Sequence, residues 1–137
     1  MKLKKFPPIS PKRKMNPSLF EDLVREALDS LPPEFQEKLS NVSVVVEDFP
    51  PREILQERNL KSPYSLLGLY VGVPQNRRGM GYSFVPPDRI LIFRIPIEAR
   101  ASTPEKVRAL VKEVVLHEIG HHFGLSEEEL ERATRDD

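Results

Sequence analysis

The most informative segment of the sequence is Val107-Arg-Ala-Leu-Val-Lys-Glu-Val-Val-Leu-His-Glu-Ile-Gly-His121. It reads as the body of one long helix. Upstream, Ser102-Thr-Pro-Glu105 offers an N-cap residue, an early proline and an acid in the first turn. Downstream, the helix is expected to end near Phe123, because Gly124 can adopt the left-handed conformation of a C-terminal cap.

The apolar stripe of this helix leads into three ionisable side chains. At ~100° per residue, one face collects Val107, Leu110, Val111, Val114, His117, Glu118 and His121. We therefore expect these side chains to face the core, with Lys112 on the solvated side. Ionisable groups on a core-facing stripe are costly unless something compensates them, and a bound metal ion would do so.

The spacing of the histidines favours a zinc site. Histidines at positions i and i+4, here His117 and His121, have Cβ atoms ~5–6 Å apart, so both imidazoles can converge on one ion. Glu118 lies beside them and can serve as the general base for a metal-activated water. We expect one Zn²⁺ per chain. The alternative is a pair of buried structural histidines without metal. Within the motif, Gly120 is expected to mark the close approach of a neighbouring strand.

A third ligand is expected beyond the end of the helix. Gly124 can turn the chain back, so that Glu127 reaches the ion, with Glu128 as an alternative. The competing interpretation is that these acidic side chains only stabilise the N-terminus of a helix. Ser126-Glu-Glu-Glu129 forms a capping-box pattern for such a short last helix. His122 points about 140° away from His117, which favours packing or support of the site over ligation.

The rest of the chain predicts a small α+β domain. Ser18-Leu-Phe-Glu21 predicts a capping box for a first helix, which ends at Pro32-Pro33. A short second helix is expected to start from these prolines. β-Branched and apolar runs predict three strands, at 42–47, 66–73 and 89–95, and a Gly/Pro loop spans 74–87. This order gives a sheet of about three strands, an active-site helix and flanking helices.

Composition limits the function classes. The chain of 137 residues has the size of one domain, which we place at 18–137. It contains no cysteine, which excludes thiolate zinc sites and cysteine nucleophiles and favours a reducing compartment, the cytoplasm. No apolar run is long enough to span a membrane. A charged fraction of 31% and 14 prolines favour a thermophilic source.

Charge is concentrated at the start. Residues 1–17 contain six Lys or Arg, four prolines and no acid, so the remainder carries a net charge of −6 in a chain whose formal charge is zero. We interpret this segment as a mobile basic tail. It can be a solubilising extension without a partner or an arm that contacts RNA or an acidic protein.

Four segments resemble a known family, the minimal metalloprotease-like or zincin-like metallopeptidase proteins of bacteria. They are Val44–Pro51, Leu67–Gly72, Pro87–Phe93 and, as the specific one, His117–Leu125 within the pattern HExxHxxGxx[D/E]. The likeness covers residues 18–131 and implies a minimal zincin-like fold, metal on His117 and His121, and Glu118 as base. The sequence departs from the pattern in carrying Glu127 where Asp is expected, and in having no methionine after Met80 to form a Met-turn.

Three functions follow from these patterns. The first is a zinc metallopeptidase that binds a peptide or protein substrate along an edge strand. The second is a metal-dependent RNA-processing hydrolase, for which the basic tail and Arg77-Arg78 would bind phosphates. The third is a metal-binding module without turnover, which the missing Met-turn favours. The oligomeric state stays open.

Overall fold

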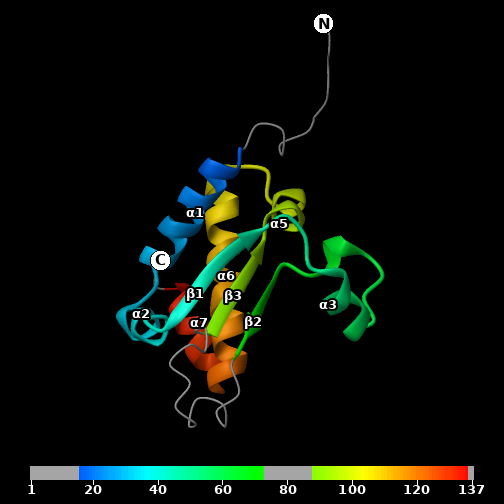
Figure 1. Cartoon of the computed structure of the whole chain (residues 1–137). Helices are drawn as coiled ribbons and strands as arrows, with labels where there is room; N and C mark the ends of the chain where they lie inside the picture. The colour runs from blue at the N-terminus through cyan, green and yellow to red at the C-terminus, as the bar shows by residue number, and fades with distance from the viewer. Residues whose placement is uncertain (1–15, 73–87, 136–137) are drawn as a thin grey trace, which may run out of the picture.

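The structure is a computed structural model and describes residues 16–72 and 88–135. Figure 1 shows a small sheet packed against helices. Along the chain the elements are α1 (Pro17–Asp29), α2 (Pro33–Lys38), β1 (Val42–Glu47), α3 (Arg52–Glu57), the 3₁₀ turn η3 (Pro63–Ser65), β2 (Gly68–Val71), β3 (Asp88–Phe93), α5 (Arg94–Arg100), α6 (Pro104–Phe123) and α7 (Glu127–Arg135). The predicted loop 74–87 and most of the predicted tail, residues 1–15, lie outside the described residues.

The three strands form a mixed sheet in the order β1-β3-β2. β1 runs parallel to the central strand β3, whereas β2 runs antiparallel to it. Within the described part of the chain, β1 and β2 are therefore the edge strands. The α+β class and the three-stranded sheet predicted from the sequence are confirmed.

Successive residues of β3 point to opposite faces of the sheet, and this alternation separates two apolar clusters. Ile90 and Ile92 face α1 and α6, in the main core. Leu91 and Phe93 face the other side, where they pack with Leu69 of β2 and with residues around α3. The main core also contains Phe20, Leu23, Val24, Ala27, Leu31, Phe35, Ile97, Ala101, Val107, Val111, Val115, Leu116, Ile119 and Leu130. The helix-covered face thus carries most of the buried apolar area.

Local signals set most helix ends. The N-cap of α6 is Thr103, whose side chain accepts from the amide of Lys106, and Gly124 ends the helix with φ 68°. α7 starts with the predicted capping box, in which Ser126 N donates to Glu129 Oε1 at 2.9 Å and Glu129 N donates to Ser126 Oγ at 3.1 Å.

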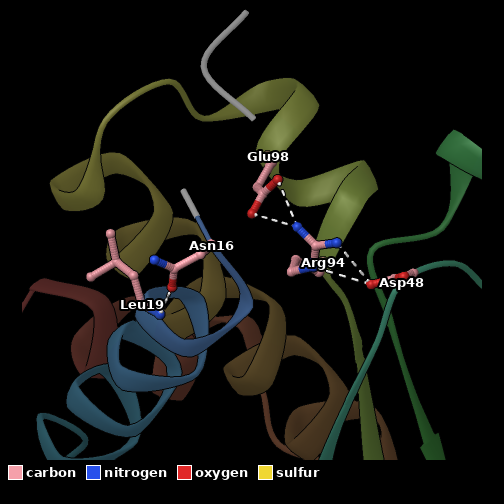
Figure 2. A network of polar contacts seen from close by, with 5 residues as sticks. All are labelled: Asn16, Leu19, Asp48, Arg94 and Glu98. Atoms are coloured by element: carbon pink, nitrogen blue, oxygen red, sulfur yellow. Dashed lines mark hydrogen bonds and ion pairs between the residues drawn. The ribbon is translucent and has the colours of Figure 1, made fainter. Parts of the chain in front are cut away.

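The capping box predicted for α1 is wrong. The N-cap is Asn16, two residues before Ser18, and its side chain accepts from the amide of Leu19 at 2.8 Å, as Figure 2 shows. Pro17 follows at the first helical position, where a missing N–H costs nothing. Asn16 and Pro17 belong to the predicted tail 1–17, but the structure has them as the N-cap and the first residue of α1.

Three short elements were not predicted: α3, η3 and α5. The apolar run from Arg89 to Ile95 was read as one strand, but the strand ends at Phe93 and α5 starts at Arg94. A short apolar run has no periodicity that separates a buried strand from a buried helix. Pro96 gives no warning of a break either, because it lies in the first turn of α5, where proline is tolerated.

An ionic cluster fixes the end of β3 where α5 begins. The Arg94 guanidinium contacts Oδ1 of Asp48 at 2.9 Å through Nη2 and both carboxylate oxygens of Glu98 at 3.2 Å through Nη1 (Figure 2). The Glu98 side chain is only 1% exposed. Burial alone would lower the pKa of Arg94, but the hydrogen bonds and charges of Asp48 and Glu98 outweigh burial and raise it. The cluster joins the segment after β1 to α5.

None of the helices described combines the length and apolar composition that a membrane span requires.

Candidate metal centre

The predicted site residues His117, Glu118 and His121 lie on α6, but not on its core-facing side. The buried side of the helix is instead centred on Val111, Val115 and Ile119. His117 and His121 are exposed and Glu118 is half-buried. The expectation that all three face the core is therefore wrong, and so is the placement of Lys112 on the solvated side, since Lys112 is only 5% exposed.

The shift has a simple cause. Leu110 and Val114, which the periodicity placed in the centre of the stripe, lie half-buried at its border. Val115 and Leu116, which the stripe left out, are buried because α1 and the sheet enclose that side of the helix. The histidines consequently lie where the helix surface meets solvent, and a ligand can reach them without unfolding the core.

His117 is held in a form suited to metal binding. Its Nδ1 lies 2.9 Å from the carbonyl oxygen of Glu113, one turn earlier in α6. A carbonyl oxygen only accepts, so Nδ1 carries the proton in this contact and the lone pair resides on Nε2. A backbone carbonyl on the second ring nitrogen is the usual support of a metal-ligating histidine.

Glu118 is tied to the sheet edge. Its Oε1 accepts a hydrogen bond from the backbone amide of Tyr70, in β2, at 2.7 Å. This contact joins α6 to the edge strand and fixes one carboxylate oxygen. The half-buried carboxylate is therefore oriented by the strand beside it rather than left as a mobile surface group.

Two residues around Glu118 were not assigned a role from the sequence, Tyr70 and Asp88. The Tyr70 ring stacks on His122, with centroids 3.9 Å apart and planes at 17°. Its hydroxyl donates to Asp88 Oδ2 at 2.7 Å, and His122 Nε2 lies 3.7 Å from the same oxygen. Asp88, an acidic residue at the start of a strand whose last four residues are apolar, was the available signal. His122 packs as the sequence analysis favoured.

A shallow groove adjoins the site. It has a volume of about 270 Å³ and is formed by the segment leading into β2 and one face of α6. Its lining residues are Leu66, Leu67, Gly68, Leu110, Glu113, Val114, His117 and Glu118. Half of these residues are Leu or Val, and the two site residues lie at one end of the groove.

The predicted third ligand is not brought to the histidines. Glu127 and Glu128 are exposed in the first turn of α7. Among residues 16–72 and 88–135, no three His, Cys, Asp or Glu side chains are grouped closely enough to hold a metal ion. The two histidines supply nitrogen donors at the i, i+4 spacing that suits zinc. In His117 the proton on Nδ1 leaves the lone pair of Nε2 for the ion. Glu127 as third ligand remains a prediction.

Gly120 allows α7 to dock. A Cβ at this position would lie 2.9 Å from Cδ1 of Leu130, so the glycine accommodates a side chain of α7. The prediction that a strand lies next to Gly120 is wrong. α7 thus packs against the last turns of α6 through Leu130, which is 7% exposed.

A sheet with an antiparallel edge strand, and a histidine pair beside a glutamate on the adjoining helix, are the features expected of a zincin-type protein. Comparison with known families agrees: the zincin-like metallopeptidase family matches residues 39–136. The chain belongs to the zincin-like metallopeptidase family. None of the curated proteins compared with the chain matches it.

Proposed function

We propose that this protein is a zinc-dependent metallopeptidase in which His117 and His121 bind the ion and Glu118 is the general base. The contact between Glu118 and the Tyr70 amide carries the proposal, because it ties the carboxylate of the residue next to His117 to the edge strand β2. Membership of the metallopeptidase family supports peptide hydrolysis as the reaction.

Each residue has a separate task. Zinc, when bound, would act as a Lewis acid and lower the pKa of a water molecule. The Glu118 carboxylate takes the proton from the attacking water and later delivers it to the leaving amine. One of its oxygens is fixed by Tyr70, so the carboxylate needs little reorganisation before it accepts the proton. The Glu113 carbonyl keeps the His117 ring in its ligating orientation.

β2 offers a backbone edge for an extended peptide. Phe93 N donates to the Leu67 carbonyl, which makes these two a hydrogen-bonded pair across the antiparallel strands. Because such pairs alternate along the register, Gly68 and Tyr70 turn their backbone groups away from β3. Because the Tyr70 amide already donates to Glu118, a substrate strand added along this edge would pair with the backbone of Gly68. It would pass His117 and Glu118 and place an apolar side chain in the adjoining groove.

Metal analysis tests the histidine pair. The purified protein is expected to bind about one zinc per chain, and His117→Ala and His121→Ala are each expected to lose most of it. His122→Ala is the matched control, because its ring packs on Tyr70 and its loss should leave the stoichiometry intact. Equal zinc content in all four proteins would refute the site.

Hydrolysis tests the base. Glu118→Gln is expected to keep the zinc and lower the hydrolysis of a protein substrate such as casein by about a hundredfold or more, the usual contribution of a general base. Glu105→Gln, the same change in the exposed first turn of α6, should be neutral. Full activity in Glu118→Gln would assign Glu118 a structural role.

The third ligand is tested by chelator competition. We expect Glu127→Ala to weaken zinc binding strongly and Glu127→Asp to weaken it less, because Asp is the residue that the related pattern carries. Glu128→Ala should change little if Glu127 is the ligand. If Glu128→Ala is the variant that loses zinc, the ligand is the next residue; if neither does, it comes from elsewhere.

A metal-binding module without turnover is the second candidate, favoured by the absence of a methionine after Met80 that could form a Met-turn. It predicts zinc binding by the wild-type protein together with no hydrolysis.

The RNA-processing alternative depends on Arg77-Arg78 and the basic tail, which lie outside the described residues apart from Asn16 and Pro17. We assign the protein to the cytoplasm on the absence of cysteine alone.

A further inference from the structure

We propose that Tyr70, His122 and Asp88 form a positioning cluster that holds the Glu118 carboxylate in its working orientation. The catalytic meaning of this cluster rests on the proposed function, but its geometry can be tested without any substrate. Tyr70 is the centre of the cluster, because it makes three different contacts through its amide, its ring and its hydroxyl.

The first part of the argument is the geometry of α6. Glu118 and His122 are four residues apart and lie on the same side of the helix. Both reach Tyr70: Glu118 accepts from its amide at 2.7 Å, and His122 stacks on its ring at 3.9 Å between centroids. One turn of α6 therefore holds one residue of β2 at two points. Two contacts fix the rotation of the strand relative to the helix, which one hydrogen bond would leave free.

Asp88 adds a third fixed point, on the central strand. It is only 7% exposed and accepts from the Tyr70 hydroxyl at 2.7 Å. A hydrogen bond to a carboxylate is stronger than one between neutral groups, so it constrains the tilt of the ring within the stack. His122 Nε2 lies 3.7 Å from the same carboxylate oxygen.

Gly72 leaves room for the stack. A Cβ at this position would lie 3.2 Å from Cε1 of His122 and 3.6 Å from Cε1 of Tyr70. The first distance is short enough that His122 would have to move. A glycine two residues after Tyr70 is thus explained by the ring that passes beside it, and Gly72→Ala becomes a mild way to disturb the cluster without removing any member.

A purely structural role makes a different prediction. β2 is held to β3 along the whole of the register, so the strand should stay paired when the cluster is lost. If the cluster only stabilised the fold, its variants would raise exchange throughout β2 together with global unfolding. If it positions Glu118, the loss should be centred on the Tyr70 amide.

The experiment is residue-resolved amide hydrogen exchange by NMR on the full chain without added metal. Glu118→Ala sets the reference, because it removes the acceptor; exchange at the Tyr70 amide should accelerate about tenfold or more, as expected for a lost hydrogen bond to a charged group. Tyr70→Leu and His122→Leu should accelerate the amide at position 70 severalfold, and Gly72→Ala less. Tyr64→Leu is the matched control, since Tyr64 contacts Phe49 away from the site.

Two outcomes decide the matter. Acceleration confined to the amide at position 70 in Tyr70→Leu and His122→Leu supports the cluster, and so does partial rescue in Tyr70→Phe, which keeps the ring but not the hydroxyl. Wild-type exchange at that amide in the Leu variants overturns it. If a Leu variant does not fold, Tyr70→Phe and Gly72→Ala give the same test with smaller changes, and an unchanged amide in both overturns the proposal.

Activity adds a separate readout. With casein as substrate, we expect His122→Leu to lower kcat while KM stays within about twofold, because the substrate groove is intact and only the base is displaced. If Glu118→Gln keeps full activity, or the wild-type protein shows no hydrolysis, the proposed function fails, and the exchange measurement still decides whether the cluster holds Glu118.

Discussion

The two ends of β3 each bury a carboxylate, but they surround it differently. At the end where α5 begins, Glu98 is 3% exposed and faces the guanidinium of Arg94. At the start of the strand, Asp88 is 7% exposed and accepts from a phenol, with an imidazole ring nearby. The first arrangement pairs opposite charges, whereas the second orients two rings beside Glu118.

This difference indicates separate roles. The Arg94 cluster links the segment after β1 to α5 and contacts none of the predicted site residues. The Asp88 cluster touches β2 and α6, which carry the two partners of the Glu118 contact. We therefore expect substitutions in the Arg94 cluster to lower stability with little effect on the site. Substitutions in the Asp88 cluster should affect the site more than stability.

The largest expected effect is at the first end. Arg94→Ala leaves the buried Glu98 carboxylate without its guanidinium partner and should lower the free energy of unfolding by about 3 kcal/mol. Arg25→Ala, which breaks the exposed pair with Asp22, should cost at most about 0.5 kcal/mol. Urea titrations measure both. Zinc affinity should match the wild type in each variant; a marked loss in Arg94→Ala would contradict the separation of the two ends.

A smaller loss of stability is expected between the two ends of β3, where β2 packs against α6. A Cβ at Gly68 would lie 2.6 Å from Cγ1 of Val114 and 3.0 Å from the Leu91 carbonyl oxygen. Gly68→Ala should force the helix and strand apart and cost about 2 kcal/mol, as overpacking does. Thermal unfolding gives the loss, and the double variant Gly68→Ala, Val114→Ala should recover part of it. No recovery would show that the carbonyl contact dominates.

At the second end, the change in stability should be smaller than the change in the site. Asp88→Asn keeps an acceptor for the Tyr70 hydroxyl but removes the charge, so we expect about 1 kcal/mol of destabilisation. The same variant should accelerate exchange at the Tyr70 amide more than at other β2 amides. A loss as large as that of Arg94→Ala, spread over the sheet, would remove the distinction between the two ends.

The sequence predicted what depends on local rules. The spacing from His117 to His121, the left-handed Gly124 and the Ser126–Glu129 capping box each involve residues within one or two turns, and the structure has the helices where these signals place them. The three strands were found because β-branched runs are distinctive.

Most of what failed at the site depends on contacts between distant segments. The buried arc of α6 is set by α1 and the sheet, so periodicity within the helix could not locate it, and Lys112 was placed on the wrong side. Tyr70 contacts Asp88 and Glu118, which lie 18 and 48 positions further along the chain. Leu130, rather than a strand, is the neighbour of Gly120 for the same reason.

The smallest expected effect concerns α7, which packs on α6 near the second end. Hydrogen bonds from the Ser126 amide and side chain lower the pKa of Glu129 below its ordinary value of 4.5. A lowered pKa in the folded state adds stability that is complete above the ordinary pKa and is lost as pH falls through the folded value. Glu129→Gln keeps an acceptor for the capping box, so it removes the charge alone.

We therefore expect Glu129→Gln to lower the melting temperature at pH 7 by the smallest amount in this series, and the difference from the wild type to shrink as the pH falls below about 4.5. Glu131→Gln, an exposed change in the same helix, is the control for overall charge. Melting curves at pH 7 and below pH 4 measure both. Because Leu130 follows Glu129 and seats against Gly120, fraying of α7 would first expose the last turns of α6. If Glu129→Gln also weakened zinc binding at pH 7, the capping box would be part of what holds the second end together; if its difference from the wild type grew at low pH, the charge of Glu129 would not be its stabilising feature.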